Sequence, residues 1–334
     1  MIFYHPDCDL RFSEYGIEIP IVDERAAHVF SALKYLYPFL EYTDLKTLPR
    51  ITREDLERVH NKDFIHRLLG TAGERQGEIY QCYELVNDQG KFERYNPKNQ
   101  KRDWKELVET ILMQVAMTYN STKYALKNGF SYHLGGGMHH AMSFAGRGFC
   151  LVNDIVITLR KLQNEGAIKT AWIVDVDVHK GDGAPEILQN DTTIRTFSIH
   201  MKEGWPLNSG TVRDPWFIPS SIDVGIEIGE DDQYLARLEA GLLDMEERFP
   251  NPDVVIVVNG ADPYEHDELP SASFINLSKE QMLARDKFLY QFFKERNIPQ
   301  SYVMAGGYGT KAWEIYLQFL KFVGENSSLR VKQE

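Results

Sequence analysis

The sequence predicts an α/β protein in which a mostly parallel sheet carries helices on both faces. Short runs rich in β-branched residues alternate with longer segments of helical periodicity. Several of the short runs are apolar throughout, which is typical of strands that are covered on both faces. The chain has 334 residues, which is ample for a large core, and α/β chains of this length often fold as one domain. Ligands of such sheets bind beyond the carboxyl ends of the strands, so the chemistry is expected there.

The individual elements follow from these patterns. We expect strands at residues 130–134, 170–178, 194–199, 222–226, 254–258 and 302–305. We expect helices at residues 22–37, 103–128, 153–165, 231–248, 278–296 and 310–323. The second of these helices has Asp103 as its N-cap and Gly129 just past its end. The polar stretch 87–103 predicts a loop, and residues 326–334 predict a polar tail after a single domain over residues 1–325.

Composition and charge exclude several classes of protein. The sequence has 37 Lys and Arg against 49 Asp and Glu, and its net charge of −12 argues against nucleic acid as the main partner. This charge is compatible with a cationic substrate, although it also serves solubility alone. No apolar run approaches the roughly 18 residues of a membrane helix, so we expect no membrane partner. Only three cysteines are present, and the first residues lack the pattern of a signal peptide, so we expect a cytoplasmic protein with reduced thiols. The oligomeric state stays open.

Four of the expected strands end in segments rich in glycine, aspartate or histidine. These segments are residues 135–140 (GGGMHH), 175–183 (DVDVHKGDG), 259–262 (NGAD) and 306–309 (GGYG). To form one site they must meet in space, which is a further reason to expect one domain.

The DVDVH segment predicts a metal site. If the strand continues to residue 178, Asp175, Asp177 and His179 share one face, because the side chains of a strand alternate. Two carboxylates and an imidazole on a buried face are costly unless a cation compensates them, and this set suits zinc or a similar metal. Asp262 completes three protein ligands, which leave a position for water and substrate as in a catalytic zinc site. The alternative is a set of helix caps and turns with a surface histidine.

The adjacent His139 and His140 suit proton transfer. Histidine titrates in the range that a general base and a general acid need. A carboxylate on the far ring nitrogen would hold each ring, and Asp175 and Asp182 are available for this. Tyr308, flanked by glycines, could donate a hydrogen bond to a developing oxyanion. A surface loop for the histidines and simple packing for the tyrosine are the alternatives.

Six motifs in this order resemble those of the histone deacetylase family, which includes bacterial acetylpolyamine amidohydrolases. They lie at residues 137–141 (GMHHA), 148–154 (GFCLVND), 175–183 (DVDVHKGDG), 198–200 (SIH), 260–262 (GAD) and 306–308 (GGY). The resemblance spans roughly residues 1–325. It implies the single-domain arginase/deacetylase fold, with an eight-stranded, mostly parallel sheet.

The resemblance also implies a role for each site residue. The ligands of one catalytic zinc ion would be Asp177, His179 and Asp262. The proton-transfer pairs would be His140 with Asp182, as the main general base and acid, and His139 with Asp175, as the electrostatic partner. Tyr308 would polarise the acyl carbonyl. A structural potassium ion would be held by Asp175, Asp177, His179, Ser198 and Ile199.

The substrate channel follows from the same resemblance. Its lining would come from Gly148, Phe149, Trp205, Leu269, Gly306 and Gly307, and Arg25 would lie at its inner end. The two aromatic residues could equally be core. Three features depart from the usual pattern, namely Met138, Lys180 and the segment 267–269 (DEL). None of them removes a catalytic group.

These features predict a zinc-dependent amidohydrolase that cleaves an N-acyl amide to an amine and a carboxylate. Leu269 lies where polyamine-directed relatives tend to have an acidic residue, so acyl-lysine or a small acylated amine is favoured as the substrate. An acetylpolyamine amidohydrolase, a manganese ureohydrolase of the arginase type and a non-catalytic binding module are the alternatives.

Overall fold

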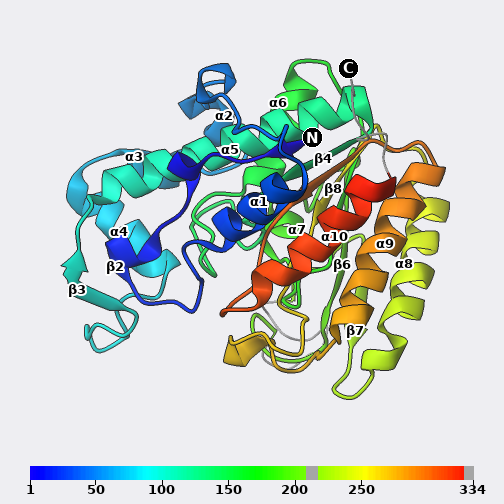
Figure 1. The fold of residues 1–334 in the computed structure, drawn as a ribbon. Helices are drawn as coiled ribbons and strands as arrows, with labels where there is room; N and C mark the ends of the chain where they lie inside the picture. The colour runs from blue at the N-terminus through cyan, green and yellow to red at the C-terminus, as the bar shows by residue number, and fades with distance from the viewer. Residues whose placement is uncertain (208–216, 327–334) are drawn as a thin grey trace.

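Seven parallel strands form the central sheet, in the order β1-β4-β9-β8-β5-β6-β7 (Figure 1). The computed structural model describes residues 1–207 and 217–326. The strands are β1 (Ile2–Phe3), β4 (Phe130–His133), β5 (Ala171–Asp175), β6 (Ile194–Met201), β7 (Ile222–Ile226), β8 (Val254–Val258) and β9 (Gln300–Val303). All neighbouring pairs are parallel, so all carboxyl ends lie at one edge. The predicted fold class is confirmed, but the strand count of eight is wrong, because the sheet in the described residues has seven strands.

Helices cover both faces of the sheet and enclose a separate apolar core on each (Figure 1). The first core is formed with α1 (Arg25–Leu36), α8 (Tyr234–Arg248), α9 (Lys279–Glu295) and α10 (Ala312–Asn326). The second is formed with α2 (Arg53–Glu57), α3 (Lys62–Leu69), α4 (Ala72–Cys82), α5 (Trp104–Asn128) and α6 (Asp154–Asn164). A short helix, α7 (Gly183–Ile187), follows the loop after β5.

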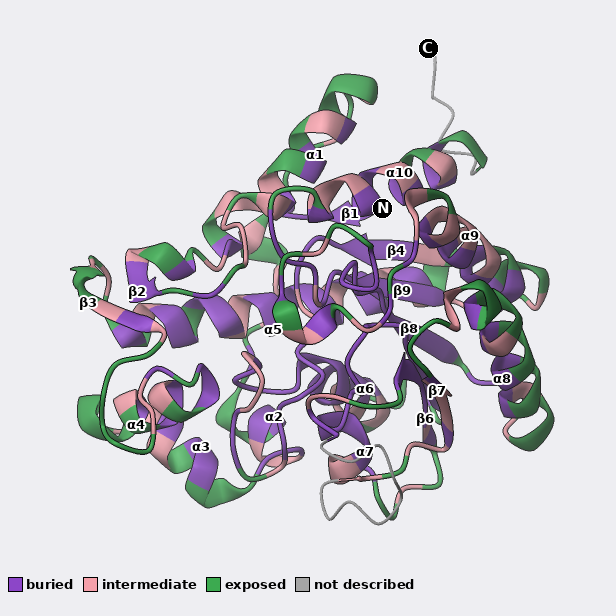
Figure 2. Cartoon of the chain, turned by 90° about the horizontal axis from the view of Figure 1, so that it is seen from below, coloured by how far each residue is buried: buried purple, intermediate pink, exposed green. Residues whose placement is uncertain are grey.

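Strand β8 shows why the central strands are apolar throughout. Val255 and Val257 face the first core, whereas Val254, Ile256 and Val258 face the second, and all five are fully buried. Both faces of the strand therefore need apolar side chains. In Figure 2 the buried colour fills β8 and its neighbour β9, while the exposed colour lies mainly on the outer helices.

The predicted helices are confirmed with small shifts at their ends. The best specified is α5, where the Asp103 side chain accepts the amide of Lys105 and Gly129 adopts a positive φ of 84° just past the last turn. The sequence patterns did not indicate α2, α3 and α4. The loop predicted at residues 87–103 is partly wrong, since it contains β3 (Tyr95–Gln100), which pairs antiparallel with β2 (Tyr15–Ile17). Residues 327–334 of the predicted tail lie outside the described residues.

The strand predicted at residues 170–178 ends earlier, at Asp175. The amide of Val176 still donates to the carbonyl of Val258 in β8, but from Asp177 onward carboxylates accept the backbone hydrogen bonds. The amide of Asp177 donates to Oδ1 of Asp175 at 3.1 Å, and the amide of His179 donates to Oδ1 of Asp177 at 3.0 Å. The backbone therefore turns at the carboxyl edge, and the alternation argument for Asp177 and His179 was wrong in its premise, although these side chains do meet.

Candidate active site

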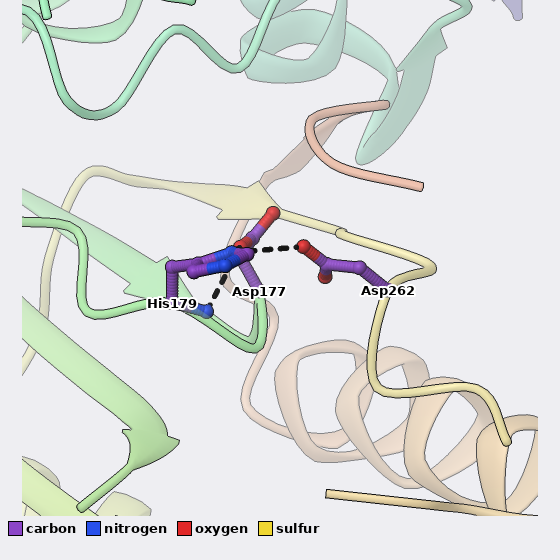
Figure 3. Close-up of side chains that lie close together, drawn as sticks. All are labelled: Asp177, His179 and Asp262. Carbon is purple, nitrogen blue, oxygen red and sulfur yellow. Dashed lines mark hydrogen bonds and ion pairs between the residues drawn. The ribbon is translucent and has the colours of Figure 1, made fainter. Parts of the chain in front are cut away.

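Asp177, His179 and Asp262 form a buried cluster at the carboxyl edge of the sheet (Figure 3). Each side chain offers one ligand atom, and the three atoms all lie within 4.8 Å of one another. Nδ1 of His179 lies 3.3 Å from Oδ1 of Asp177 and 3.2 Å from Oδ2 of Asp262. In Figure 3 the carboxylate of Asp262, from the loop after β8, points toward His179 and Asp177, which lie close together in the loop after β5. The cluster is the arrangement of donor atoms that a metal ion requires.

Pairing of β5 with β8 brings the ligand loops together. The two strands are direct neighbours, with Asp175 opposite Val258. The amide of Val178 then donates to Oδ1 of Asp262 at 3.0 Å, so each loop helps to orient the other. A third loop approaches closely at Gly306, whose amide donates to Oδ2 of Asp177 at 2.9 Å.

Two histidine–aspartate pairs lie beside this cluster. Nδ1 of His139 lies 2.7 Å from Oδ2 of Asp175, and Nδ1 of His140 lies 2.7 Å from Oδ1 of Asp182. All four side chains are buried, and the two rings lie 3.9 Å apart between centroids. The structure thus brings together the pairs that the sequence predicted.

The two histidines differ in their charge. Burial opposes a charge on His139, but the carboxylates of Asp175 and Asp177 outweigh it and raise the pKa of His139 to about 10. Burial and the adjacent His139 lower the pKa of His140 to about 3, despite Asp182. His140 is therefore neutral, and since its Nδ1 proton is donated to Asp182, its Nε2 carries the lone pair.

Among the ligands, the carboxylates repel each other. Burial and the charge of Asp177 raise the pKa of Asp262 to about 6. Burial alone would raise the pKa of Asp177, but His139 and His179 outweigh it and hold this pKa well below the usual range. Two buried carboxylates that share one imidazole are an unfavourable arrangement without a cation between them.

A cavity of about 140 Å³ leads from the cluster to the surface. Four of the predicted channel residues, Gly148, Phe149, Trp205 and Leu269, line it together with Tyr308, whereas the predicted Gly306 and Gly307 do not. The Trp205 ring stands at 76° to that of His140, with centroids 4.5 Å apart. Gly148 has no room for a side chain, because a Cβ would come within 2.3 Å of the Trp205 ring. Both aromatic residues therefore form walls of the cavity, and Phe149 also packs against both cores.

Tyr308 and Leu269 are positioned by one carboxylate. Asp267 accepts the amide of Tyr308 at 2.7 Å and the amide of Leu269 at 2.9 Å. Burial and the nearby Asp262 raise the pKa of Asp267 to about 8. This aspartate fixes the two channel residues through their backbone, a function that the sequence pattern alone did not reveal.

Arg25 contacts the segment after β9, and its predicted place at the inner end of the channel stays a prediction. Its guanidinium donates to the carbonyl oxygens of Gly307 and Ala305 at 2.8 and 2.7 Å. It lines a second cavity with Asp9, Gly136 and Met304. Arg25 therefore holds the segment that carries Gly306 and Gly307.

The predicted potassium ligands lie on the adjacent strands β5 and β6 and in the loop after β5. Asp175 pairs with Ser198 in the register of the sheet, and both are buried, as is Ile199. The Ser198 hydroxyl lies 2.9 Å from Nδ1 of His200. The potassium site stays a prediction.

Several residues that contact the site were missed by the sequence reasoning. Arg147 pairs with Oδ2 of Asp182 at 2.5 Å, and the Ser271 hydroxyl lies 3.2 Å from Nε2 of His179. Arg285 on α9 is fully buried and bonds to the ligand loops. Only Ser271 had a signal in the sequence, since it closely follows Leu269. Lys180, noted as a departure, is buried and pairs with Asp223 on β7.

A parallel sheet with a buried Asp–His–Asp cluster that could hold a metal ion, and with two histidine–aspartate pairs at its edge, is an arrangement typical of metal-dependent α/β hydrolases. The chain matches the histone deacetylase domain over residues 19–319. It therefore belongs to the histone deacetylase family, and its expected class is that of a deacetylase-type hydrolase.

Curated relatives agree with this assignment. An uncharacterised protein of Picosynechococcus sp. is 32% identical over 217 residues, which cover 64% of this chain and 68% of that protein. Histone deacetylase 2 of Arabidopsis thaliana is 26% identical over 66% of this chain, and the match spans 55% of that protein. The acetoin utilization protein AcuC of Bacillus subtilis is 25% identical over 89% of this chain and 74% of that protein.

A solved structure supports the fold. The crystal structure of the HDA15 HD domain matches with a TM-score of 0.70, covering 98% of this chain and 91% of that one. At 18% sequence identity, this likeness shows the shared fold alone. No helix among the described residues combines the length and the apolar character that crossing a membrane requires.

Proposed function

We propose that this protein is a zinc-dependent amidohydrolase that removes the acyl group from acyl-lysine or a small acylated amine. The observation that carries the proposal is the buried Asp177–His179–Asp262 cluster, with the His140–Asp182 pair beside it, at the end of an apolar channel. Membership of the histone deacetylase family supports the same reaction class.

The residues of the cluster fit a zinc ion. Two carboxylates and one imidazole are ligands that zinc accepts, and three protein ligands leave a position for water and substrate. The backbone is also shaped for an ion, because a Cβ at position 306 would lie 2.4 Å from Oδ2 of both Asp177 and Asp262. Asp177, His179 and Asp262 would hold the zinc ion. When bound, zinc supplies a Lewis acid that makes coordinated water more acidic and polarises an acyl carbonyl.

His140 would act as the general base and then as the general acid. Its Nδ1–H group donates a hydrogen bond to Asp182, so Nε2 would be the atom that accepts the proton of the attacking water. The same atom would then deliver a proton to the leaving amine. His139, whose positive charge is held by Asp175, would stabilise the negative charge that develops next to it.

Tyr308 would donate a hydrogen bond to the acyl oxygen. It lies in the wall of the cavity beside His140 and His179, and burial raises its pKa well above the usual value. The hydroxyl therefore keeps its proton through the neutral range, which a hydrogen-bond donor to an oxyanion requires. Phe149 and Trp205 would exclude water from the substrate's linker, the apolar chain between its acyl amide and the rest of the molecule. The backbone carbonyl of Gly148 would accept a hydrogen bond from the substrate amide.

The substrate preference rests on Leu269. This residue lines the cavity and gives it an apolar wall where an acidic side chain would favour a polyamine.

We propose a potassium ion on Asp175, Asp177, His179, Ser198 and Ile199 as a structural element, and the cytoplasm as the compartment. The thiols of Cys8, Cys82 and Cys150 are all buried and unpaired.

The proposal is tested by metal counting combined with an activity screen. Protein stripped with a chelator should be inactive, and one equivalent of zinc should restore hydrolysis of acetyl-lysine peptides. Tight binding of two equivalents of manganese, with hydrolysis of a guanidino substrate, would favour the arginase-type alternative. Within the described residues, one group of His, Cys, Asp and Glu side chains has the geometry of a metal site. A much faster cleavage of acetylspermidine than of any acyl-lysine would instead show a polyamine enzyme.

A further inference from the structure

The outer end of the cavity carries two charged side chains, Glu84 and Arg94. The inner lining residues His140, His179 and Tyr308 are at most 8% exposed. By contrast, the side chains of Arg94 and Glu84 are 37% and 50% exposed. These two residues therefore form the mouth of the cavity. The part of a substrate that lies beyond its linker would contact them.

Among the residues that the structure describes, Arg94 is the only one with a permanent positive charge that lines this cavity. Its guanidinium lies over the ring of Phe149, with its central carbon 5.2 Å from the ring centroid. The Phe149 ring is in turn stacked on Tyr83, at 8° between planes, and its backbone is held by the carbonyl of Cys82. The packing of Phe149 therefore holds the Arg94 guanidinium at the outer end of the channel wall.

The donors of Arg94 are not exhausted by its present contact. Within residues 1–207 and 217–326, its one ionic partner is Glu84, at 2.9 Å between Nη1 and Oε2. A guanidinium has five N–H donors in a planar fork that matches a carboxylate. Half-exposed ion pairs contribute little free energy, so an arriving carboxylate can share or replace this contact at small cost.

Glu84 would complement a positive charge on the same substrate. Within residues 1–207 and 217–326 it is the only acidic side chain that lines the cavity, and it follows Tyr83, the C-cap of α4, at a positive φ of 53°. This left-handed position favours glycine or asparagine. The mouth therefore holds one cation and one anion side by side, a pattern that matches a zwitterion.

From this arrangement we infer that Arg94 selects substrates with a free carboxylate beyond the linker, namely N-acylated diamino acids such as Nε-acyl-lysine. The inference rests on the proposed function. The acyl amide would enter the channel, the apolar linker would lie between Phe149 and Trp205, and the α-carboxylate would pair with Arg94. The α-ammonium group would then face Glu84. An acylated polyamine would place a cation where the carboxylate belongs.

The test compares two small substrates on the zinc-loaded, full-length protein. One is Nε-acetyl-lysine with a free carboxylate, and the other is its α-carboxamide. We expect the wild type to favour the carboxylate in kcat/KM by about tenfold, mainly through KM, as a charge-assisted but half-exposed contact would. Arg94→Gln should abolish this preference, and Arg94→Lys should restore part of it.

Arg53→Gln is the matched control. Arg53 is 51% exposed on α2, pairs with Glu57 and does not line the cavity, so its loss changes the net charge equally. It should keep the wild-type preference. Equal kcat/KM for the two substrates in the wild type, or an equal loss of preference in Arg53→Gln, would overturn the inference. If neither substrate is cleaved but acetyl-lysine peptides are, the inference fails while the proposed function stands, and if none is cleaved, both fail.

Discussion

Nη1 of Arg285 lies 2.9 Å from the carbonyl oxygen of Gly260 and donates a hydrogen bond to it. The same nitrogen donates to the carbonyl of Val176 at 3.0 Å. Gly260 lies just before Asp262, and Val176 just before Asp177, so one guanidinium ties both ligand loops to α9. Its charge is compensated by Asp286, which accepts from Nε at 2.9 Å, and Arg285 is 1% exposed. The metal cluster is therefore supported from beneath by a single buried cation.

Replacing Arg285 by Lys should weaken metal binding. A lysine keeps the charge opposite Asp286 but has no planar fork with which to hold two carbonyls and a carboxylate at once. We expect zinc affinity to fall about tenfold or more, as removal of groups that orient metal ligands does. Competition with a chromogenic chelator measures the affinity, and thermal unfolding checks that the variant is folded.

Arg296→Lys provides the comparison for this change. Arg296 follows the same helix and binds Glu246 with two nitrogens, at 2.7 and 2.9 Å, without contact to either ligand loop. Its replacement should leave zinc affinity at the wild-type value. An Arg285→Lys protein that binds zinc as tightly as the wild type would contradict the supporting role.

A methyl group at position 306 should abolish metal binding. In Gly306→Ala the new Cβ would lie 2.4 Å from a carboxylate oxygen of Asp177 and of Asp262, so both would have to move. We expect loss of stoichiometric zinc by elemental analysis of the purified protein. Gly73→Ala in α4 is the control, since its Cβ would meet no atom within 4 Å and alanine favours a helix. Full zinc occupancy in Gly306→Ala would contradict the proposed ligand set.

Removal of the Tyr308 hydroxyl should reduce turnover without releasing the metal. The loss of one hydrogen bond to a developing oxyanion typically lowers kcat by about 10²–10³-fold. Steady-state kinetics and zinc content of Tyr308→Phe, measured on the same preparation, separate the two effects. Unchanged turnover would remove the oxyanion role, and loss of zinc would show that the residue is needed for the fold of the site.

Acid should destabilise the protein through His60. Its Nδ1 lies 2.8 Å from the carbonyl of Met142, and its Nε2 lies 3.0 Å from the amide of Asn153, so the ring donates once and accepts once, as only neutral histidine can. Burial lowers the pKa of His60 from 6.5 to about 4. The unfolded chain therefore binds the proton more tightly. The stabilisation is complete above pH 6.5 and is lost as the pH falls toward 4, by about 3 kcal/mol in total.

Denaturant unfolding at pH 7 and pH 4.5 measures this effect. His60→Gln should be less stable than the wild type at pH 7 but should lose less stability on acidification. His133 and His200, whose pKa values burial lowers to about 3, remain in both proteins, so the difference isolates His60. His66→Gln, a change on the exposed side of α3, should follow the wild-type pH dependence. Parallel pH curves for His60→Gln and the wild type would contradict this assignment.

Much of the fold could be predicted because its elements have strong local signals. The apolar run of β8 and the caps of α5 locate these elements without tertiary information. Strand β1 could not be predicted, because its two residues acquire strand geometry only by pairing with β4. The helix α4 carries Gly73 and Gly77, which weaken its local pattern, although Thr71 and Glu74 form a capping box at its start.

The sequence predicted those site residues whose own side chains suit the chemistry. It did not reveal residues that reach the site only through tertiary packing. The motif residues Asp177, His179 and Asp262 meet as expected. Arg285 could not be found, because an arginine on a helix is usually exposed, and only the packing of α9 brings it under the two loops. Arg94 was missed for a similar reason, since β3 is assembled from a stretch whose composition is that of a loop.

His179 and Asp262, two of the proposed zinc ligands, are separated by 83 residues in the chain and become neighbours only when β5 pairs with β8. Zinc bound there would accordingly have little affinity for the unfolded chain. By mass action, a free zinc concentration of 100 times the dissociation constant would stabilise the native state by about 2.7 kcal/mol. The central strand pair thus couples metal supply to the survival of the folded protein, so that starvation for zinc would lower its abundance as well as its activity.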